Sequence, residues 1–154
     1  MHKLWIMRHG QAQSMAPSDE QRPLTEVGVS QVQINYQFLQ DQTLTHVFVS
    51  PFLRAQQTFE TLKSQGLQYQ SLQTVDWVTP DVATQPAIDH LLALEGENLN
   101  VLIVCHQTFA GRLATHLCDG DTSGRHVDTA AIVALETEVF ASQCATLCNI
   151  SSAY

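Results

Sequence analysis

The chain has 154 residues, of which 44% are hydrophobic, 14% charged and 7% aromatic, values typical of a globular domain rather than a disordered chain. Its formal net charge is −8, with only seven lysine and arginine residues, which argues against binding to nucleic acid or to an anionic membrane, since both require a basic surface. No apolar stretch is long enough to span a bilayer, and the amino terminus lacks the pattern of a signal peptide. We therefore expect a single domain over residues 1–154 that is cytoplasmic and monomeric.

The amino-terminal part of the chain predicts a strand, a loop and a helix. Residues 3–7 form a short apolar run typical of a buried strand, which ends at residues 8–10. A polar loop with two prolines follows. Thr25 has the features of a helix N-cap, because apolar residues recur at helical spacing from there to Leu39.

The next segment predicts a second strand and a second helix. The strand covers residues 46–50. Pro51 suits the first position of a helix, with Ser50 as its cap, and the helix is expected to end near Gln65. Residues 70–75 predict a further, weaker strand.

The clearest strand in the chain lies over residues 101–105, a continuous apolar run typical of the middle of a sheet that is covered on both faces. The other expected elements of this half are an irregular segment over 77–86, a short helix over 88–94, a helix capped by Thr108 and ending near Leu117, a polar loop over 119–128, and strands over 130–136 and 146–151. Strands separated by helix-length segments predict an α/β fold with a mainly parallel central sheet and helices on both faces.

The chain contains four cysteines, Cys105, Cys118, Cys144 and Cys148. None forms a C-x-x-C pair, and nothing in the sequence indicates export. We therefore expect four reduced thiols, most of them buried. The alternative is a zinc site made by Cys144, Cys148 and a distant histidine.

Three groups of polar residues follow predicted strands directly. They are residues 8–10 (Arg-His-Gly), residues 50–54 and His106. In open α/β sheets, ligands bind outside the carboxyl ends of the strands. The sequence thus predicts that these groups, far apart along the chain, meet at one edge of the sheet.

The residue types at this edge suit phosphoryl transfer. A neutral imidazole at His9 can attack phosphorus, and the guanidinium of Arg8 matches two phosphate oxygens. Arg54 falls in the first turn of its predicted helix, whose amino end also favours a dianion. His106 can stabilise charge on the phosphoryl oxygens, and Gly10 would let the backbone approach the anion closely.

Each of these side chains also has a plain structural interpretation. His9 would be an ordinary loop histidine, and His106 a strand-end histidine bonded to the backbone. Arg54 would pair with Glu60 or with another surface acid. The combination of all three motifs at one edge favours the functional interpretation.

The motifs also carry a resemblance to a known family. Met-Arg-His-Gly at residues 7–10, Arg-Pro-Leu-Thr at 22–25, Ser-Pro-Phe-Leu-Arg-Ala-Gln-Gln-Thr at 50–58 and the strand with its histidine at 101–106 occur in this order. This pattern resembles the histidine phosphatase superfamily, with its phosphoglycerate-mutase-like fold. In length and motifs the chain is similar to the small SixA-type phosphohistidine phosphatases.

The resemblance implies a role for each matching residue. His9 would be the nucleophile, with Arg8, Arg54 and His106 completing the phosphate pocket. Arg22 would lie near the phosphate, because it matches the arginine that precedes Pro-Leu-Thr in the small members. The mechanism requires no metal ion and no organic cofactor.

The chain also departs from the family pattern. Cys105 stands where glycine or serine usually precedes the second histidine, and residues 107–109 differ from the typical continuation. Larger relatives carry a carboxylic general acid in an inserted region that this chain lacks. Such an acid is worth about 10²–10⁴ in rate. Asp76 and Asp81 are the candidates to replace it.

Without that acid, the enzyme should prefer a leaving group that departs easily, as the imidazole of phosphohistidine does. We therefore expect a phosphohistidine-protein phosphatase whose partner is a phosphorylated protein histidine, for example on a phosphotransfer domain of a signalling relay. The alternatives are a small-molecule phosphomonoesterase of the same fold and a binding module for phosphorylated partners with little catalysis.

Overall fold

The structure, a computed structural model, describes residues 1–152, so the last two residues of the expected domain lie outside the described part. Its strands are β1 (His2–Arg8), β2 (Thr43–Leu44), β3 (His46–Val49), β4 (Gln68–Tyr69), β5 (Leu72–Thr74), β6 (Asn100–Cys105), β7 (Ile132–Thr137) and β8 (Thr146–Ser151). Its helices are α1 (Glu26–Asn35), α2 (Leu53–Gln65), α3 (Gln85–Leu92) and α4 (Phe109–Asp119), with short 3₁₀ turns η1 (Asp19–Gln21) and η2 (Tyr36–Phe38).

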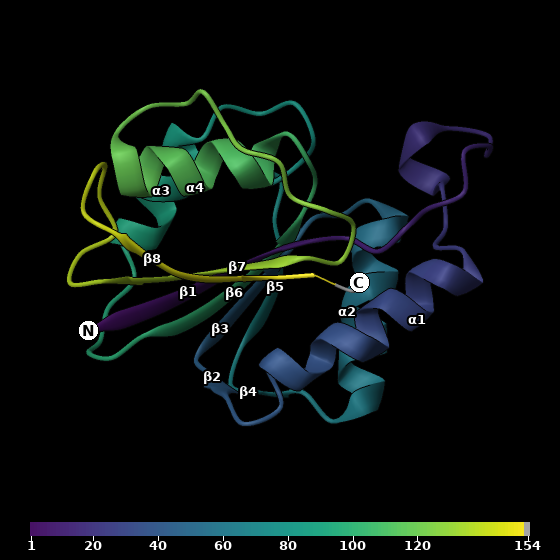
Figure 1. The fold of residues 1–154 in the computed structure, drawn as a ribbon, viewed down its shortest axis with the longest axis horizontal. Coiled ribbons are helices and arrows are strands. Elements are labelled where there is room, and N and C mark those ends of the chain that lie inside the picture. Colours follow the sequence, from purple (N-terminus) through teal and green to yellow (C-terminus); the bar gives the residue numbers. More distant parts are fainter. Residues whose placement is uncertain (153–154) are drawn as a thin grey trace.

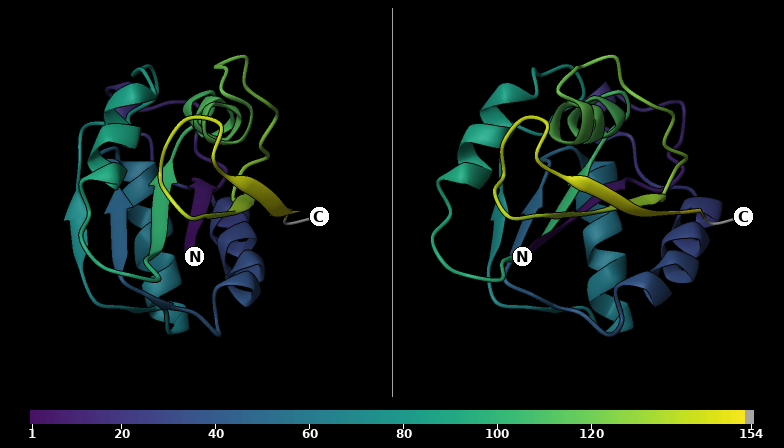
Figure 2. Two further views of the ribbon diagram at one scale, coloured as in Figure 1. Left: turned by 90° about the vertical axis from the view of Figure 1, so that its left-hand side faces the viewer. Right: turned by 60° about the vertical axis from the view of Figure 1, so that its left-hand side comes forward.

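Six strands form the central sheet in the order β5-β3-β6-β1-β7-β8, and β2 and β4 make a separate pair. The strands β5, β3, β6 and β1 run parallel, whereas β7 and β8 join through antiparallel pairings. Figure 2 shows β5 at one edge of the sheet and β8 at the other. The mainly parallel sheet confirms the prediction, and its parallel strands bring the ends of β1, β3 and β6 to the same edge.

The central strand β6 shows why the sheet needs helices on both faces. Alternate side chains of a strand point to opposite faces. Val101, Ile103 and Cys105 therefore enter one core, and Leu102 and Val104 enter the other. All five are fully buried. The helices α3 and α4 cover the first face, and α1 and α2 cover the second (Figure 1).

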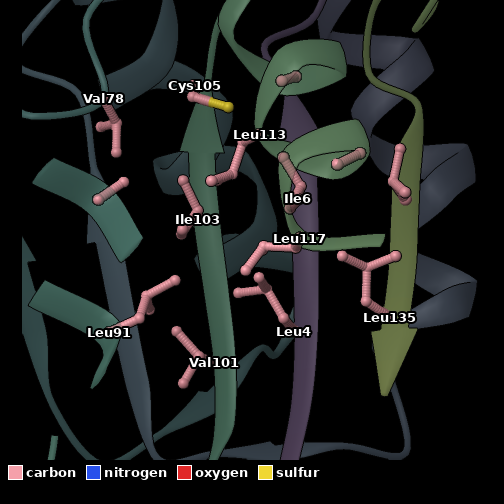
Figure 3. Close-up of a cluster of buried hydrophobic side chains, with 14 of the residues drawn as sticks. Leu4, Ile6, Val78, Leu91, Val101, Ile103, Cys105, Leu113, Leu117 and Leu135 are labelled. Atoms are coloured by element: carbon pink, nitrogen blue, oxygen red, sulfur yellow. The ribbon is translucent and has the colours of Figure 1, made fainter. Parts of the chain in front are cut away.

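The first core holds α4 in place over the sheet. Figure 3 shows Leu113 and Leu117 of α4 packed near Leu4 and Ile6 of β1, while Leu91 of α3 lies near Val101 of β6. Burying one such side chain stabilises the fold by roughly 2 kcal/mol. This packing also fixes the turn that precedes α4, where His106 lies.

The helix α1 begins as predicted. Thr25 is its N-cap, and its Oγ1 accepts a hydrogen bond from the Gly28 N–H at 3.0 Å. Thr108 also occupies the predicted N-cap position of α4, but its side chain makes no capping hydrogen bond.

The predicted start of α2 is wrong by two residues. The helix begins at Leu53, and Phe52 rather than Ser50 occupies the N-cap position. Pro51 therefore precedes the helix. The Ser50 hydroxyl accepts a hydrogen bond from the Phe52 N–H at 3.3 Å, but its second contact is with a histidine of the site described below.

Two other boundaries differ from the sequence prediction. The helix α3 begins at Gln85 rather than residue 88, with Pro86 in its first turn, where a missing N–H costs no helical hydrogen bond. The weak strand expected over 70–75 is present as the shorter β5, and β4 precedes it as a separate short strand. Within the described residues 1–152, no helix has the length and apolar character needed to cross a membrane.

Candidate active site

The loops after β1, β3 and β6 meet at the carboxyl edge of the sheet, at the right-hand end of the ribbon in Figure 1. His9, Arg54 and His106 are buried there, with exposed fractions of 6%, 4% and 1%. The His9 and His106 rings lie edge to face, with their centroids 5.2 Å apart. The residues that the sequence predicts to converge thus do so, although nearly a hundred positions separate the two histidines.

The hydrogen bonds of His9 define which of its nitrogens is free to react. Its Nδ1 lies 2.6 Å from the Gly10 carbonyl oxygen. A carbonyl oxygen can only accept, so Nδ1 carries the ring proton and Nε2 presents a lone pair. Burial, reinforced by the charge on Arg54, lowers the pKa of His9 to about 4, against a smaller opposing effect of the Gly10 hydrogen bond. The imidazole is therefore neutral near pH 7.

Arg54 connects His9 to the loop that carries Asp19. It is the second residue of α2, so the helix places it beside the loop after β1. Its Nε–H donates a hydrogen bond to His9 Nε2 at 3.2 Å. Its Nη1 and Nη2 donate to the backbone oxygen and the carboxylate of Asp19, at 2.7 and 3.2 Å. Arg54 thus pairs with a surface acid, as the structural interpretation allows, but this acid is Asp19 and not Glu60.

His106 is held by the end of β3. Its Nε2 lies 2.7 Å from Ser50 Oγ. Because Ser50 Oγ also accepts the Phe52 N–H, it can give its own proton to Nε2. The ring proton of His106 then sits on Nδ1, which is buried without a hydrogen-bond partner among the described residues. Burial, together with His9 and Arg54, lowers the pKa of His106 to about 3, so this ring is also neutral.

Arg8 and Gly10 flank His9 in the chain. The Nη1 of Arg8 donates to the Val127 carbonyl at 3.0 Å, which ties the loop before β7 to the site. The N–H of Gly10 is used by Thr58 Oγ1, and a Cβ on Gly10 would lie 2.6 Å from the carbonyl oxygen of Gly28. The structure thus gives Gly10 a packing role, and the close approach of its backbone to an anion stays a prediction.

Asp19 is a site residue that the sequence reasoning missed. Its Oδ1 lies 2.8 Å from Arg22 Nη1, and its Oδ2 lies 3.2 Å from Arg54 Nη2. The carboxylate therefore bridges Arg22 and Arg54. Arg22 also donates through Nε to the Gln13 carbonyl. The hydrogen bond from Arg22, with a second from Arg54, holds the pKa of Asp19 below its ordinary value. The sequence indicates this ion pair only through the spacing, because Asp19 lies three residues before Arg22.

The two candidate acids of the sequence analysis lie on the surface. Asp76 and Asp81 are both exposed. Asp76 lines a hollow with Pro51 and Trp77, beside the end of β3.

The expectation of mostly buried cysteines is wrong. Cys105 is buried in the first core, where burial raises the pKa of its thiol to about 12. Cys118 is partly buried, and Cys144 and Cys148 are exposed. All four are free thiols. In the described part of the chain, no three His, Cys, Asp or Glu side chains gather closely enough to hold a metal ion.

Comparison with known proteins identifies the family of this chain. The chain is 37% identical over 125 residues to the phosphohistidine phosphatase SixA of Escherichia coli (strain K12), a match that covers 78% of this chain and 76% of that protein. The chain belongs to the histidine phosphatase superfamily. The family model described as Histidine phosphatase superfamily (branch 1) matches residues 4–76, which include His9, Arg22 and Arg54.

This histidine phosphatase is also similar to two further proteins. The phosphohistidine phosphatase SixA homolog of Haemophilus influenzae (strain ATCC 51907 / DSM 11121 / KW20 / Rd) is 33% identical over 124 residues, covering 74% of this chain and 76% of that protein. The solved structure of the protein histidine phosphatase SixA complexed with tungstate is 31% identical, with a TM-score of 0.86 over 98% of this chain and 97% of that one.

Proposed function

We propose that this histidine phosphatase hydrolyses phosphohistidine on a partner protein, through a covalent phosphohistidine formed on His9. The observation that carries the proposal is the state of His9. Its Nε2 is unprotonated and accepts a hydrogen bond from Arg54 Nε–H, and its ring is neutral near pH 7. A neutral imidazole that faces guanidinium groups can attack a bound phosphoryl group.

The surrounding side chains supply positive charge and hydrogen-bond donors for the phosphoryl oxygens. Arg54 and Arg8 offer planar guanidinium groups whose positive charges act on His9. The buried Nδ1–H of His106 has no partner among the described residues, and a phosphoryl oxygen would satisfy it. Asp19 occupies Arg54 in this structure, so the incoming phosphoryl group would replace a carboxylate as the anion bound there.

The reaction then has two steps. In the first, His9 Nε2 forms a bond to phosphorus while the bond from phosphorus to the substrate's imidazole nitrogen breaks, and that nitrogen takes up a proton from solvent. In the second, a water oxygen attacks the phosphorus, the bond to His9 breaks, and the water proton passes to solvent. Inorganic phosphate leaves, and Nε2 regains its lone pair.

The preferred leaving group depends on whether the site has an acid that can protonate it. The carboxylate closest to the pocket is Asp19, whose lowered pKa keeps it ionised near pH 7. It therefore has no proton to give to an alkoxide, and esters of alcohols should react slowly. An imidazole leaves readily once solvent has protonated it. The SixA proteins, whose names specify phosphohistidine, support the same choice.

The proposal is tested by comparing kcat/KM for a phosphohistidine-bearing phosphotransfer domain with kcat/KM for a panel of alkyl and sugar phosphates. We expect a preference for phosphohistidine of at least about 10², the lower end of what a general acid contributes. A preference for the esters would overturn the assignment.

The nucleophile is tested with His9→Ala, and His46→Ala, at the start of β3 on the opposite edge of the sheet, serves as the matched control. His9→Ala should abolish turnover and the acid-labile phosphoenzyme, while His46→Ala retains both. Full activity in His9→Ala would remove His9 from its role.

A further inference from the structure

The seven basic residues are distributed unevenly over this acidic chain. Arg8, Arg22 and Arg54 belong to the phosphate pocket. Lys3 lies at the start of β1 and Lys63 in the last turn of α2, so both are at the opposite, amino-terminal edge of the sheet. The two remaining basic residues lie beside the phosphate pocket, and they have no part in the mechanism above.

These two residues, Arg112 and Arg125, line a surface pocket of about 370 Å³. The other lining residues are Gln107, Thr108, Ser123, Gly124 and His126. We call this hollow the arginine pocket. None of its lining residues is acidic, whereas the hollows near the amino terminus and beside β3 contain Glu97 and Asp76. The lining therefore favours an anionic ligand.

The arginine pocket is adjacent to the phosphate pocket along the chain and in space. Gln107 follows His106 directly, and its amide nitrogen donates to the Arg125 carbonyl at 2.6 Å. Arg8 donates to Val127, two residues beyond Arg125. One side chain of the phosphate site thus holds the same loop that carries Arg125.

The loop is also fastened to α4, so the arginine pocket is already formed. Thr115 Oγ1 accepts from the Gly124 N–H at 3.1 Å and lies 3.0 Å from the Asp121 carbonyl. Gly111 lets the loop pack closely, because a Cβ there would lie 2.0 Å from the Arg125 carbonyl oxygen. A pocket held in this way needs little ordering when a ligand binds.

The two guanidinium groups are not neutralised by carboxylates. Arg112 donates to Thr108 Oγ1 and to the Val82 carbonyl, both uncharged acceptors. Arg125 is exposed, and its side chain makes no hydrogen bond or ion pair with any of residues 1–152. The nearby carboxylate of Asp128 contacts His126 instead, and Asp119, which lines a neighbouring hollow together with Arg125, makes no ion pair with it. Among the described residues, no carboxylate therefore pairs directly with either guanidinium group.

We propose that the arginine pocket binds an aspartate or glutamate side chain of the partner protein, next to the phosphohistidine that enters the phosphate pocket. This inference rests on the proposed function and adds a second contact to it. Guanidinium groups bind carboxylates through paired hydrogen bonds. On a surface of net charge −8, an acidic partner is attracted at this edge and repelled elsewhere, so the contact also orients the docking.

The test compares Arg125→Gln with Lys63→Gln. Both side chains are exposed and both substitutions remove one positive charge, but Lys63 lies at the opposite edge. Each variant is assayed with a phosphohistidine protein that has acidic residues beside its phosphohistidine, with the same protein after those residues are changed to glutamine or asparagine, and with an aryl phosphate. Arg125→Gln should lower kcat/KM about three- to fivefold for the acidic protein, mainly through KM, and leave the other two substrates unchanged. Arg125→Glu should lower it further.

The possible results separate the alternatives. If Arg125→Gln and Lys63→Gln lower kcat/KM for the acidic protein equally, the effect comes from long-range charge alone. If Arg125→Gln lowers kcat/KM for the aryl phosphate as much as for the acidic protein, the pocket is a site for small anions. Either result overturns the docking contact. No loss in either arginine variant also overturns it, while turnover of the phosphohistidine protein by the unaltered enzyme leaves the proposed function intact. Failure of the unaltered enzyme to act on any phosphohistidine protein would remove both proposals.

Discussion

His9 and His106 share one property, a pKa far below that of an ordinary histidine. Burial is the main cause for both, and the arginine beside them adds to it. The arrangement keeps both rings neutral at the pH of the cell. A neutral ring at His9 is a nucleophile, and a neutral ring at His106 still donates one N–H.

The same shift predicts how stability depends on pH. In the unfolded chain His9 takes up a proton below about pH 6.5, whereas in the folded chain it does so only near pH 4. Between these values the unfolded state binds more protons, so the free energy of unfolding falls as the pH falls. His9 alone should contribute a loss of roughly 3 kcal/mol across this window.

The measurement is a series of urea titrations from about pH 7 to about pH 4.5. His9→Asn should show a shallower fall than the unaltered protein, because the substituted side chain no longer titrates. Identical slopes in the two proteins would mean that His9 is not the group that titrates.

At the residue scale the sequence could predict the chemistry but not all of the contacts. His9, Arg8, Arg54 and His106 stand in motifs at strand ends, and parallel strands leave little choice about where such motifs meet. Asp19 has no motif of its own and reaches Arg54 only through the fold of an exposed loop.

At the element scale, α4 depends on one glycine. Gly111 faces the loop that carries Arg125, and a Cβ would overlap the carbonyl oxygen of Arg125. Helix propensity alone would make Gly111→Ala stabilising by about 1 kcal/mol. The overlap should reverse the sign and destabilise the fold by roughly 1–3 kcal/mol. Displacing the loop would also move the Val127 carbonyl from Arg8.

Urea titration of Gly111→Ala gives the sign directly. A loss of stability together with a lower kcat/KM for an aryl phosphate would connect this helix–loop contact to the phosphate site. A gain in stability would show that the loop moves away without cost.

The sequence predicts those helices and strands whose positions follow from a pattern of buried apolar residues. Residues 101–105 are apolar on both faces, so their place at the centre of the sheet followed from the sequence alone. The start of α2 did not, because Ser50 looks like a cap and instead bonds His106, a partner 56 residues away. The strand order also depends on pairings between distant segments, which local patterns do not specify.

At the scale of the whole molecule, the excess of acidic residues and the arginines at the sheet edge act on a partner in opposite directions. The net charge of −8 repels an acidic protein at long range. The five arginines attract it at short range, over one edge only. At moderate salt the Debye length is about 10 Å, so the nearby arginines should dominate over charges on the far side.

This balance predicts the sign of the salt effect on turnover of an acidic phosphohistidine protein. We expect kcat/KM to fall roughly three- to tenfold as the ionic strength rises from about 0.05 to about 0.5 M, because salt screens the attraction at the docking edge. An aryl phosphate, assayed in parallel, corrects for the effect of salt on the phosphate pocket itself. Arg125→Gln should show a smaller salt dependence than the unaltered enzyme, and Lys63→Gln the same dependence. An increase of kcat/KM with salt would mean that the overall negative charge governs the encounter and that the arginine edge does not steer it.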